Sequence, residues 1–423
     1  MRSASILAAC ISTALVVSRA PVCAGKPIPP PPDGVVRVAT YNVSMYRDRA
    51  GALLAEMCGG RSPQVRQIAE VLQRVRPDVV LLNEFDYDPT GPGGPGPPAL
   101  VRAFRREYLE QPQRGLRPLR LQHAFYRPVN TGFDSGFDLD KDGAKGGPAD
   151  AYGYGRYPGQ YGMLLLSRFP IDADRSRTFQ KLRWKDYPGA RLPSVPETGK
   201  GYYSAAELDA FRLSSKSFWD VAVRSSTSGG DPRWLHMLCS HPTPPSFDGP
   251  EDRNGKRNYD EIGMVAAYLD SAAEHPRLFR DDTSGRPVTF DRAQPFVVLG
   301  DLNADPVDGG GTPGAIRQLL DHRLINGSVS PRSEGGVAAS RDAVELNRAQ
   351  RGDPAHDTAD FGGDGYSNLR VDYALPSKQL RVIATGVFWP RPGEPGSEAV
   401  RATDHRLVWI DVKLPDAGAA WAP

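Results

Sequence analysis

The sequence lacks long hydrophobic runs, a surplus of charge and any repeating period. Its most apolar stretch near the start, Ile6 to Val17, is interrupted by Ser12 and Thr13. It is too short to span a bilayer comfortably, and no later segment does better, so no transmembrane segment is expected. Glycine (44) and proline (40) are abundant but recur without a fixed period. This excludes a repeat protein and indicates long ordered loops.

Charge is balanced once the first residues are set aside. Residues 1–24 contain two arginines and no acidic residue, so the 52 Lys+Arg of the full chain fall to 50, against 50 Asp+Glu. A protein whose main function is to bind long nucleic acid usually carries a basic surplus. The neutral balance disfavours that class, although it leaves room for a local basic patch.

The N-terminal residues have the pattern of an export signal. Arg2 supplies the positive start, the apolar run follows, and Val22-Cys23-Ala24 offers a cleavage site. A buried N-terminal helix and a lipid anchor on Cys23 are the alternatives. We therefore expect a secreted or periplasmic protein with a signal peptide (1–24), a stiff Pro-rich linker (25–34), one domain (35–415) and a frayed tail (416–423).

Two cysteines, Cys58 and Cys239, lie outside the predicted signal peptide. An oxidising compartment would permit a disulfide between them. The alternative is a buried free thiol at Cys239, which lies in an expected central strand. The sequence leaves this choice open.

Hydrophobic periodicity predicts alternating strands and helices, and therefore an α/β domain. Ser62-Pro63 is a typical helix start, and apolar residues at helical spacing follow it. A second amphipathic pattern begins near Ile262. We expect strands at 35–43, 79–82, 162–167, 219–224, 234–240, 296–300, 371–375 and 407–412.

Polar residues follow three of these strands directly. Glu84 comes after VVLL, His241 after WLHMLCS, and Asp301 after FVVLG. Ligands of open α/β sheets bind at the carboxyl ends of the strands. The three residues are therefore expected to meet at one site.

Their chemistry suits the hydrolysis of a phosphoester. Such a hydrolase must bind a hard cation, activate water and neutralise charge on the phosphorus centre. Magnesium prefers one or two carboxylates plus water, a role that Glu84 and Asp404 could fill. A histidine oriented by a carboxylate is the usual base near neutral pH, and His405 with Asp372 fits that role.

Seven short motifs occur in one order along residues 35–412. Each is weak alone, but together they resemble the endonuclease/exonuclease/phosphatase superfamily. That superfamily includes pancreatic-type deoxyribonucleases, abasic-site endonucleases, neutral sphingomyelinases and inositol-polyphosphate phosphatases. The motifs are Thr40-Tyr41-Asn42, PDVVLLNE ending at Glu84, LSRFP ending at Pro170, Ser240-His241, Gly300-Asp301-Leu302-Asn303, Arg370-Val371-Asp372-Tyr373 and Thr403-Asp404-His405.

The resemblance implies a four-layer α/β sandwich of two mixed β-sheets flanked by helices. It also implies a metal site, with Glu84 as the main ligand and Asn42 and Asp404 in or near the metal shell. The implied cofactor is Mg²⁺ or Mn²⁺. Asn42 could instead simply end a strand and bond the backbone.

The same resemblance assigns catalytic roles. Asp301 would orient or deprotonate the attacking water, and Asn303 would hold a phosphate oxygen. His405, held by Asp372, would act as base or transition-state stabiliser, and His241 would donate to the scissile phosphate or leaving group. Whether the water belongs to Asp301 or His405 stays open.

Three features depart from the family pattern. No glutamate partner can be located for His241, the middle histidine of that pattern, and the connection 132–162 is longer than usual. The stretch 242–260 is expected to be a loop, in which Arg253 and Arg257 either contact substrate phosphate or are merely solvated.

Within the long connection, Asp138, Asp140 and Asp142 followed by Gly143 match the opening of a calcium loop. The twelfth position is Ala149, with Asp150 one residue late, and flanking helices are not evident. The pattern disfavours a helix-loop-helix hand but is compatible with a single-loop structural Ca²⁺ site. A plain acidic turn is the alternative.

The sequence thus predicts an exported, metal-dependent hydrolase of a small phosphorylated or phospholipid-type ester. An extracellular nuclease with nucleic acid as substrate is the first alternative. A binding module without catalysis is a remote one, because the whole set of reactive residues is present. Nothing in the sequence indicates an obligate protein partner.

Overall fold

The computed structural model describes residues 27–89, 98–225, 233–341, 345–362 and 367–415. The predicted signal peptide and tail, and most of the Pro/Gly-rich stretch after Glu84, lie outside these residues. No helix in the described ranges is long and apolar enough to cross a membrane.

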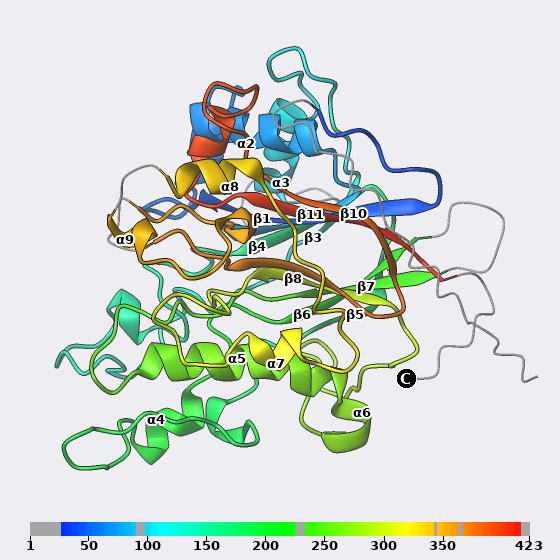
Figure 1. The fold of residues 1–423 in the computed structure, drawn as a ribbon. Helices are drawn as coiled ribbons and strands as arrows, with labels where there is room; N and C mark the ends of the chain where they lie inside the picture. The colour runs from blue at the N-terminus through cyan, green and yellow to red at the C-terminus, as the bar shows by residue number, and fades with distance from the viewer. Residues whose placement is uncertain (1–26, 90–97, 226–232, 342–344, 363–366, 416–423) are drawn as a thin grey trace, which may run out of the picture.

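Within these ranges the strands form two mixed sheets (Figure 1). The six-stranded sheet has the order β10-β11-β1-β2-β4-β3, and the five-stranded sheet has the order β5-β6-β7-β8-β9. The first comprises β1 (Val35–Met45), β2 (Val79–Phe85), β3 (His123–Phe125), β4 (Met163–Ser167), β10 (Arg381–Phe388) and β11 (Leu407–Lys413). The second comprises β5 (Ile171–Thr178), β6 (Trp219–Arg224), β7 (Trp234–Cys239), β8 (Phe296–Asp301) and β9 (Asp372–Pro376).

The helices of the described ranges are mostly short. The two longest are α2 (Pro63–Val75) and α5 (Arg253–Leu269). The other α-helices are α1 (Ala52–Met57), α3 (Ala99–Phe104), α4 (Ala205–Ala210), α6 (Ser271–Glu274), α7 (Arg317–Leu320), α8 (Glu334–Ala339) and α9 (Glu345–Arg348). Single turns of other type are η1 (Arg105–Leu109), η2 (Pro148–Asp150), η3 (Trp184–Asp186), η4 (Pro354–His356) and η5 (Ala399–Ala402).

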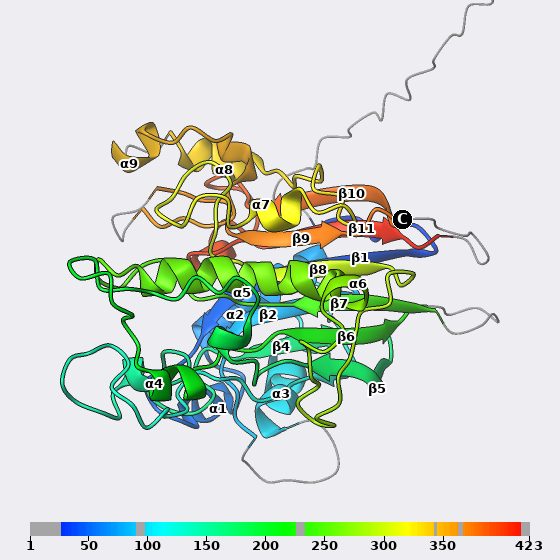
Figure 2. The same cartoon turned by 90° about the horizontal axis from the view of Figure 1, so that it is seen from below.

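Three apolar clusters divide the molecule into layers. The inner cluster lies between the sheets and includes Val38, Leu81 and Met237. A second cluster packs α2 against the six-stranded sheet, and a third packs α5 against the five-stranded sheet. Figures 1 and 2 show these helices on opposite outer faces. The predicted four-layer α/β sandwich is therefore confirmed.

Strand register brings the reactive residues together. In the parallel pair β1–β2, Asn42 lies opposite Asn83, which places Asn42 beside Glu84. In the parallel pair β7–β8, Cys239 lies opposite Leu299, so the residues that follow both strands leave the sheet at the same edge. In the antiparallel pair β8–β9, Asp301 lies directly opposite Asp372.

A buried ion pair fixes β1 to β11 below this edge. Arg37 and Asp411 are register partners, and the guanidinium donates to both carboxylate oxygens, at 2.7 and 2.8 Å. Both side chains are almost inaccessible. Such a bidentate contact stabilises one register, because a slip would leave two buried charges without partners.

All eight predicted strands and the helix start at Ser62-Pro63 are present. The Ser62 hydroxyl accepts a hydrogen bond from Val65 N at 3.4 Å, as an N-cap does. Strands β3, β5 and β10 were not predicted: β3 has three residues, and β5 carries mainly polar side chains. The loop predicted for 242–260 is wrong in its second half, because α5 begins at Arg253.

The structure adds detail on the predicted linker and on the two cysteines. Ile28, in the predicted linker, is buried in the apolar cluster beneath α2, so that part of the segment packs on the domain. Cys58 and Cys239 form no disulfide: Cys58 is exposed after α1, whereas Cys239 is buried in β7. The alternative of a free buried thiol at Cys239 is the correct one.

Candidate active site

Glu84 lies near the carboxyl end of β2 in a left-handed backbone conformation, with φ of 58°. This conformation is unfavourable for residues other than glycine and is often found at functional sites. The following residue, Phe85, donates its backbone N–H to Gly162 O at 3.1 Å, which holds the strained segment in place. The Glu84 side chain is 21% exposed and so remains accessible from solvent.

Glu84, His241 and Asp301 come together from three strands. One ligand atom of each lies within 4.8 Å of the others. His241 Nε2 is 3.5 Å from Asp301 Oδ2 and 3.9 Å from Glu84 Oε1. The predicted convergence at the carboxyl edge of the strands is therefore present in the structure.

Asn42 connects the two sheets across this centre. Its amide Nδ2 donates to Asp301 Oδ2 at 3.0 Å and lies 3.4 Å from His405 Nε2. Its Oδ1 accepts a hydrogen bond from Ser44 N at 3.1 Å. Asn42 thus orients Asp301 and also lies beside Glu84. A residue that merely ended a strand and bonded the backbone would not make both contacts.

A second cluster consists of Asp301, Asp372 and His405, again within 4.8 Å of one another. His405 Nδ1 is 2.9 Å from Asp372 Oδ2, and His405 Nε2 is 3.7 Å from Asp301 Oδ2. Asp404 is the most exposed carboxylate of the group, at 40%, and its Oδ1 is 3.9 Å from His405 Nε2. The sheet register and the turn before β11 together produce this arrangement.

Asn303 follows β8 with a left-handed backbone, φ 50°. Its N–H donates to Asp301 Oδ1 at 3.0 Å, and its Nδ2 donates to Pro242 O at 3.1 Å. Asn303 therefore ties the residue after His241 to the Asp301 turn. An amide nitrogen has two hydrogens, so Nδ2 keeps one for a further acceptor.

The charges of the centre are strongly coupled. Burial raises the pKa of Glu84 to about 7 and lowers the pKa of His241 to about 4. Burial alone would lower the pKa of His405, but the carboxylates of Asp372 and Asp301 raise it to about 10. Burial would raise the pKa of Asp301, yet His405 and His241 hold it below its ordinary value. His241 is thus neutral and His405 cationic at neutral pH.

His241 is the middle histidine of the family pattern, and no glutamate among the described residues bonds its Nδ1. His241 Nδ1 is buried and has no hydrogen-bond partner among the described residues. Glu261 of α5 instead holds two backbone segments, one at Ser215 and one at Thr243. It accepts from Ser215 N at 2.6 Å, from Ser215 Oγ at 2.9 Å and from Thr243 N at 2.7 Å.

Lys216, next to Ser215, is a further residue that the sequence did not indicate. Its side chain is 7% exposed and forms no ion pair within the part of the chain that the structure describes. Burial lowers the pKa of Lys216, while the carboxylates of Glu261, Glu84 and Asp301 raise it. The only sequence signal was a lone lysine in a serine-rich segment before β6.

The two arginines predicted to contact phosphate are both engaged by other groups of the protein. Arg257 is buried in α5, donates to the backbone carbonyls of Leu213, Tyr152 and Arg212, and stacks on Phe211. Its guanidinium therefore has a structural role, contrary to the prediction. Arg253, at the start of α5, is paired with Glu251 and is 17% exposed.

The long connection contains an acidic cluster that differs from the predicted one by one residue. Asp138, Asp140 and Asp150 bring oxygen atoms within 4.8 Å of one another, whereas Asp142 is outside the cluster. Asp142 instead accepts a hydrogen bond from Ala144 N at 2.7 Å. The residue that appeared one position late, Asp150, completes the group because the chain turns through η2.

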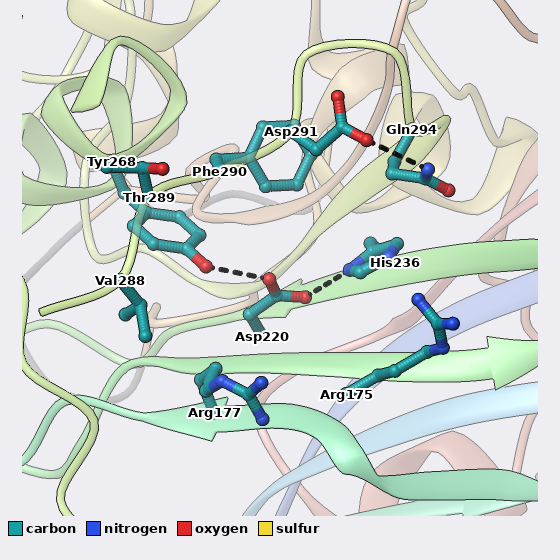
Figure 3. A pocket seen from close by; sticks show the side chains of 10 residues that line it. All are labelled: Arg175, Arg177, Asp220, His236, Tyr268, Val288, Thr289, Phe290, Asp291 and Gln294. Carbon is teal, nitrogen blue, oxygen red and sulfur yellow. Dashed lines mark hydrogen bonds and ion pairs between the residues drawn. The ribbon is translucent and has the colours of Figure 1, made fainter. Parts of the chain in front are cut away.

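A cavity of about 250 Å³ lies on the outer face of the second sheet, over Asp220 of β6 and His236 of β7 (Figure 3). Its central Asp220 lies 2.6 Å from His236 Nδ1 and accepts a hydrogen bond from Tyr268 Oη at 2.8 Å. Asp220 is thus in contact with both His236 and Tyr268. It is lined by Arg175, Arg177, Asp220, His236, Tyr268, Val288, Thr289, Phe290, Asp291 and Gln294.

The solved structures named here are similar to this chain at low sequence identity. No curated protein matches the sequence significantly. Similar solved structures include an endonuclease/exonuclease/phosphatase from Beutenbergia cavernae, with 18% identity and TM-score 0.45, covering 91% of this chain and 73% of that one. Sphingomyelinase C from Streptomyces griseocarneus has 13% identity and TM-score 0.44, covering 89% and 99%. A Staphylococcus aureus beta toxin mutant with bound magnesium ions has 11% identity and TM-score 0.40, covering 90% and 99%.

The sequence model of one family covers most of the chain. It matches residues 39–405, a span that begins within β1 and ends at His405 and so includes every candidate catalytic residue. The chain therefore belongs to the Endonuclease/Exonuclease/phosphatase family.

Proposed function

We propose that this protein hydrolyses a phosphoester with the help of a bound divalent cation, by attack of water. The observation that carries this proposal is the convergence of Glu84, His241 and Asp301 beside the Asp372–His405 pair. A small phosphorylated or phospholipid-type ester is favoured over nucleic acid, because residues 25–423 have no basic surplus.

The donor set fits Mg²⁺ or Mn²⁺. Carboxylate and amide oxygens are hard ligands, and Glu84, Asp404 and Asn42 offer them at one edge of the sheets. Burial raises the pKa of Glu84 to about 7 even though His405 and Lys216 act to lower it, so a bound cation would stabilise the carboxylate further. A cation held there would neutralise charge on the phosphate and polarise its oxygens.

The protein residues supply orientation and charge. Asp301, whose pKa is lowered by its histidine neighbours, is an ionised acceptor that can orient the attacking water. His405, cationic and held by Asp372, can stabilise the negative charge of the transition state. His241 is neutral and can donate one N–H to the phosphate or leaving group. These charge states favour Asp301 over His405 as the partner of the water.

Two finer assignments accompany this function. We propose that Asp138, Asp140 and Asp150 hold a structural Ca²⁺ ion that orders the 132–162 insertion, because all three offer oxygen ligands. We also propose export from the cytoplasm, which is supported by the charged start, apolar run and cleavage pattern of residues 1–24.

The proposal is tested by measuring hydrolysis with purified protein that lacks residues 1–24. Phosphomonoesters, phosphodiesters, a phospholipid and plasmid DNA are assayed with Mg²⁺, with Mn²⁺ and with EDTA. Hydrolysis of a small ester that requires the cation supports the proposal. Efficient cleavage of DNA with no turnover of small esters would favour a nuclease, and no turnover of any substrate would favour a non-catalytic protein.

A further inference from the structure

Two tyrosines adjoin Glu84, a third lies near one of them, and none takes part in the chemistry described so far. Tyr46 directly follows β1, Tyr161 directly precedes the turn into β4, and Tyr154 lies in the 132–162 insertion. The ring centroids of Tyr46 and Tyr161 are 4.4 Å apart, and those of Tyr154 and Tyr161 are 6.3 Å apart. Tyr46 is 37% exposed and Tyr154 is 56% exposed. We call this open aromatic surface the tyrosine platform.

Strand register places the platform beside the metal-ligand position. Met45 lies opposite Phe85 in the β1–β2 pair, so Tyr46 leaves β1 next to Glu84. Met163 lies opposite Asn83 in the β2–β4 pair, so Tyr161 approaches Glu84 from the other side. The electrostatics agree: burial raises the pKa of both tyrosines, and the Glu84 carboxylate raises each further.

The platform is a built surface held by specific contacts. Asp86 accepts hydrogen bonds from Tyr161 N at 3.2 Å and from Tyr157 Oη at 2.6 Å. Tyr87 N donates to Gly159 O at 2.7 Å. A Cβ at Gly159, where φ is 97°, would lie 2.1 Å from Tyr87 O, so only glycine permits this close approach. The insertion is thereby fixed to the end of β2, next to Glu84.

Exposed aromatic residues gathered at a catalytic centre indicate a binding surface. Tyr46 and Tyr161 are in contact, with ring planes tilted by 47°, and Tyr154 is tilted by 42° to Tyr161. Contacting rings leave no space for a cation to be enclosed on several sides, which is how aromatic cages bind quaternary ammonium groups. They do offer exposed faces on which a flat ring can stack.

We propose that the tyrosine platform stacks an aromatic ring of the substrate, so that the preferred phosphoester is a nucleoside phosphate. This inference rests on the proposed function, because it assigns a substrate class to the same site. The neutral charge of residues 25–423 favours a single nucleotide over a long strand, whose binding depends on many phosphate contacts.

The test compares two ligands that differ only in the ring, adenosine 5′-monophosphate and ribose 5-phosphate. Their dissociation constants are measured by calorimetry in the presence of Mg²⁺ and Ca²⁺. The protein used is the Glu84→Gln variant, so that turnover does not interfere with the measurement. We expect the nucleotide to bind about tenfold more tightly, the scale of one stacking contact. Tyr154→Leu in that background should lower this preference severalfold, and Tyr154→Phe should preserve it, because it keeps the ring.

Equal affinity for the two ligands, or a preference that Tyr154→Leu leaves intact, would overturn the inference. Tighter binding of phosphocholine than of the nucleotide, lost in Tyr154→Leu, would overturn it in favour of a cationic ligand. The proposed function is judged separately, from metal-dependent hydrolysis by the wild type. A ring preference without hydrolysis would therefore reject the function and keep the platform.

Discussion

His405 Nδ1 lies 2.9 Å from Asp372 Oδ2, and both side chains are buried where the turn before β11 meets the start of β9. The contact fixes which ring nitrogen faces Asp372, so that Nε2 is directed toward Asn42 and Asp301. A carboxylate in this position also stabilises the cationic imidazole. The rate of hydrolysis should therefore depend on Asp372, although this residue does not itself face the substrate.

Asp372→Asn should lower kcat by about 10²-fold or more, the range that a positioned acid–base or charged group contributes. The protein offers a matched control, because Asp220 forms a similar buried contact with His236 at 2.6 Å, outside the clusters around Glu84 and His405. Asp220→Asn should cost stability but leave kcat near that of wild type. Equal losses of kcat in the two variants, or no loss in Asp372→Asn, would contradict the orienting role.

Glu84→Gln should nearly abolish turnover at saturating Mg²⁺ while the fold persists. The substitution removes a charged metal ligand but changes almost no volume, and the side chain is partly exposed. Circular dichroism and thermal melting verify the fold, and initial rates measure turnover. Turnover equal to that of wild type would show that Glu84 is not the metal ligand.

The same variant gives a pH-dependent prediction for stability without metal. Burial raises the pKa of Glu84 from 4.5 to about 7 in the folded state, so the folded protein holds this proton more tightly than the unfolded chain. Its contribution to stability is present below pH 4.5 and is lost as the pH rises toward 7. In EDTA, wild type should lose stability over this window relative to Glu84→Gln. Parallel curves from chemical denaturation would refute this electrostatic account.

Sequence reasoning predicted which candidate site residues lie close together, because each follows a strand or ends a motif with a recognisable order. Glu84, His241 and Asp301 lie at strand ends, where topology alone brings them to one edge. It failed for Arg257 because nothing in a run of mixed charges shows that a helix begins at Arg253. It missed Lys216 and Glu261 because they act through contacts between segments that are distant in sequence.

The acidic cluster of the 132–162 insertion shows the same limit of sequence reasoning, which does not see contacts made by the folded chain. Spacing counted along the chain pointed to Asp142, whereas the turn at η2 brings Asp150 into the cluster instead. A linear motif fixes ligand positions only where the loop conformation is already known. The tyrosine platform was equally invisible, because its three rings come from separate segments.

Substitution of the two arginines of α5 should change the stability of the protein by different amounts. Arg257→Met should destabilise the protein by about 1–3 kcal/mol, because three backbone carbonyls lose a buried donor. Arg253→Gln should cost less than Arg257→Met, because Arg253 is paired with Glu251 alone and is more exposed than Arg257. Urea denaturation of both variants measures the difference. A larger loss for Arg253→Gln would reverse the assigned roles.

The Ca²⁺ assignment predicts a shift in melting temperature. An ion that binds only the folded state stabilises it by mass action, so Ca²⁺ should raise the Tm of wild type. Asp140→Ala should abolish the rise, because it removes a member of the cluster. Asp142→Ala should retain it, since Asp142 lies outside the cluster. An equal rise in Asp140→Ala and wild type, or none in wild type, would exclude the site.

The last prediction concerns salt, which separates a small substrate from a long nucleic acid. Each phosphate contact with duplex DNA contributes a slope of about −0.9 to the dependence of log affinity on log salt. Residues 25–423 are neutral, and the arginine that seemed available at Arg257 is committed to backbone carbonyls inside the protein. Arg257 is therefore not free to contact a DNA backbone, and Lys216 beside His241 can neutralise only one phosphate. We expect kcat/KM for a small phosphoester to change less than about threefold between 20 and 150 mM NaCl, and to exceed that for duplex DNA. Efficient DNA cleavage with a steep salt dependence would show that a local basic surface outweighs the neutral total, and a nuclease would become the better assignment.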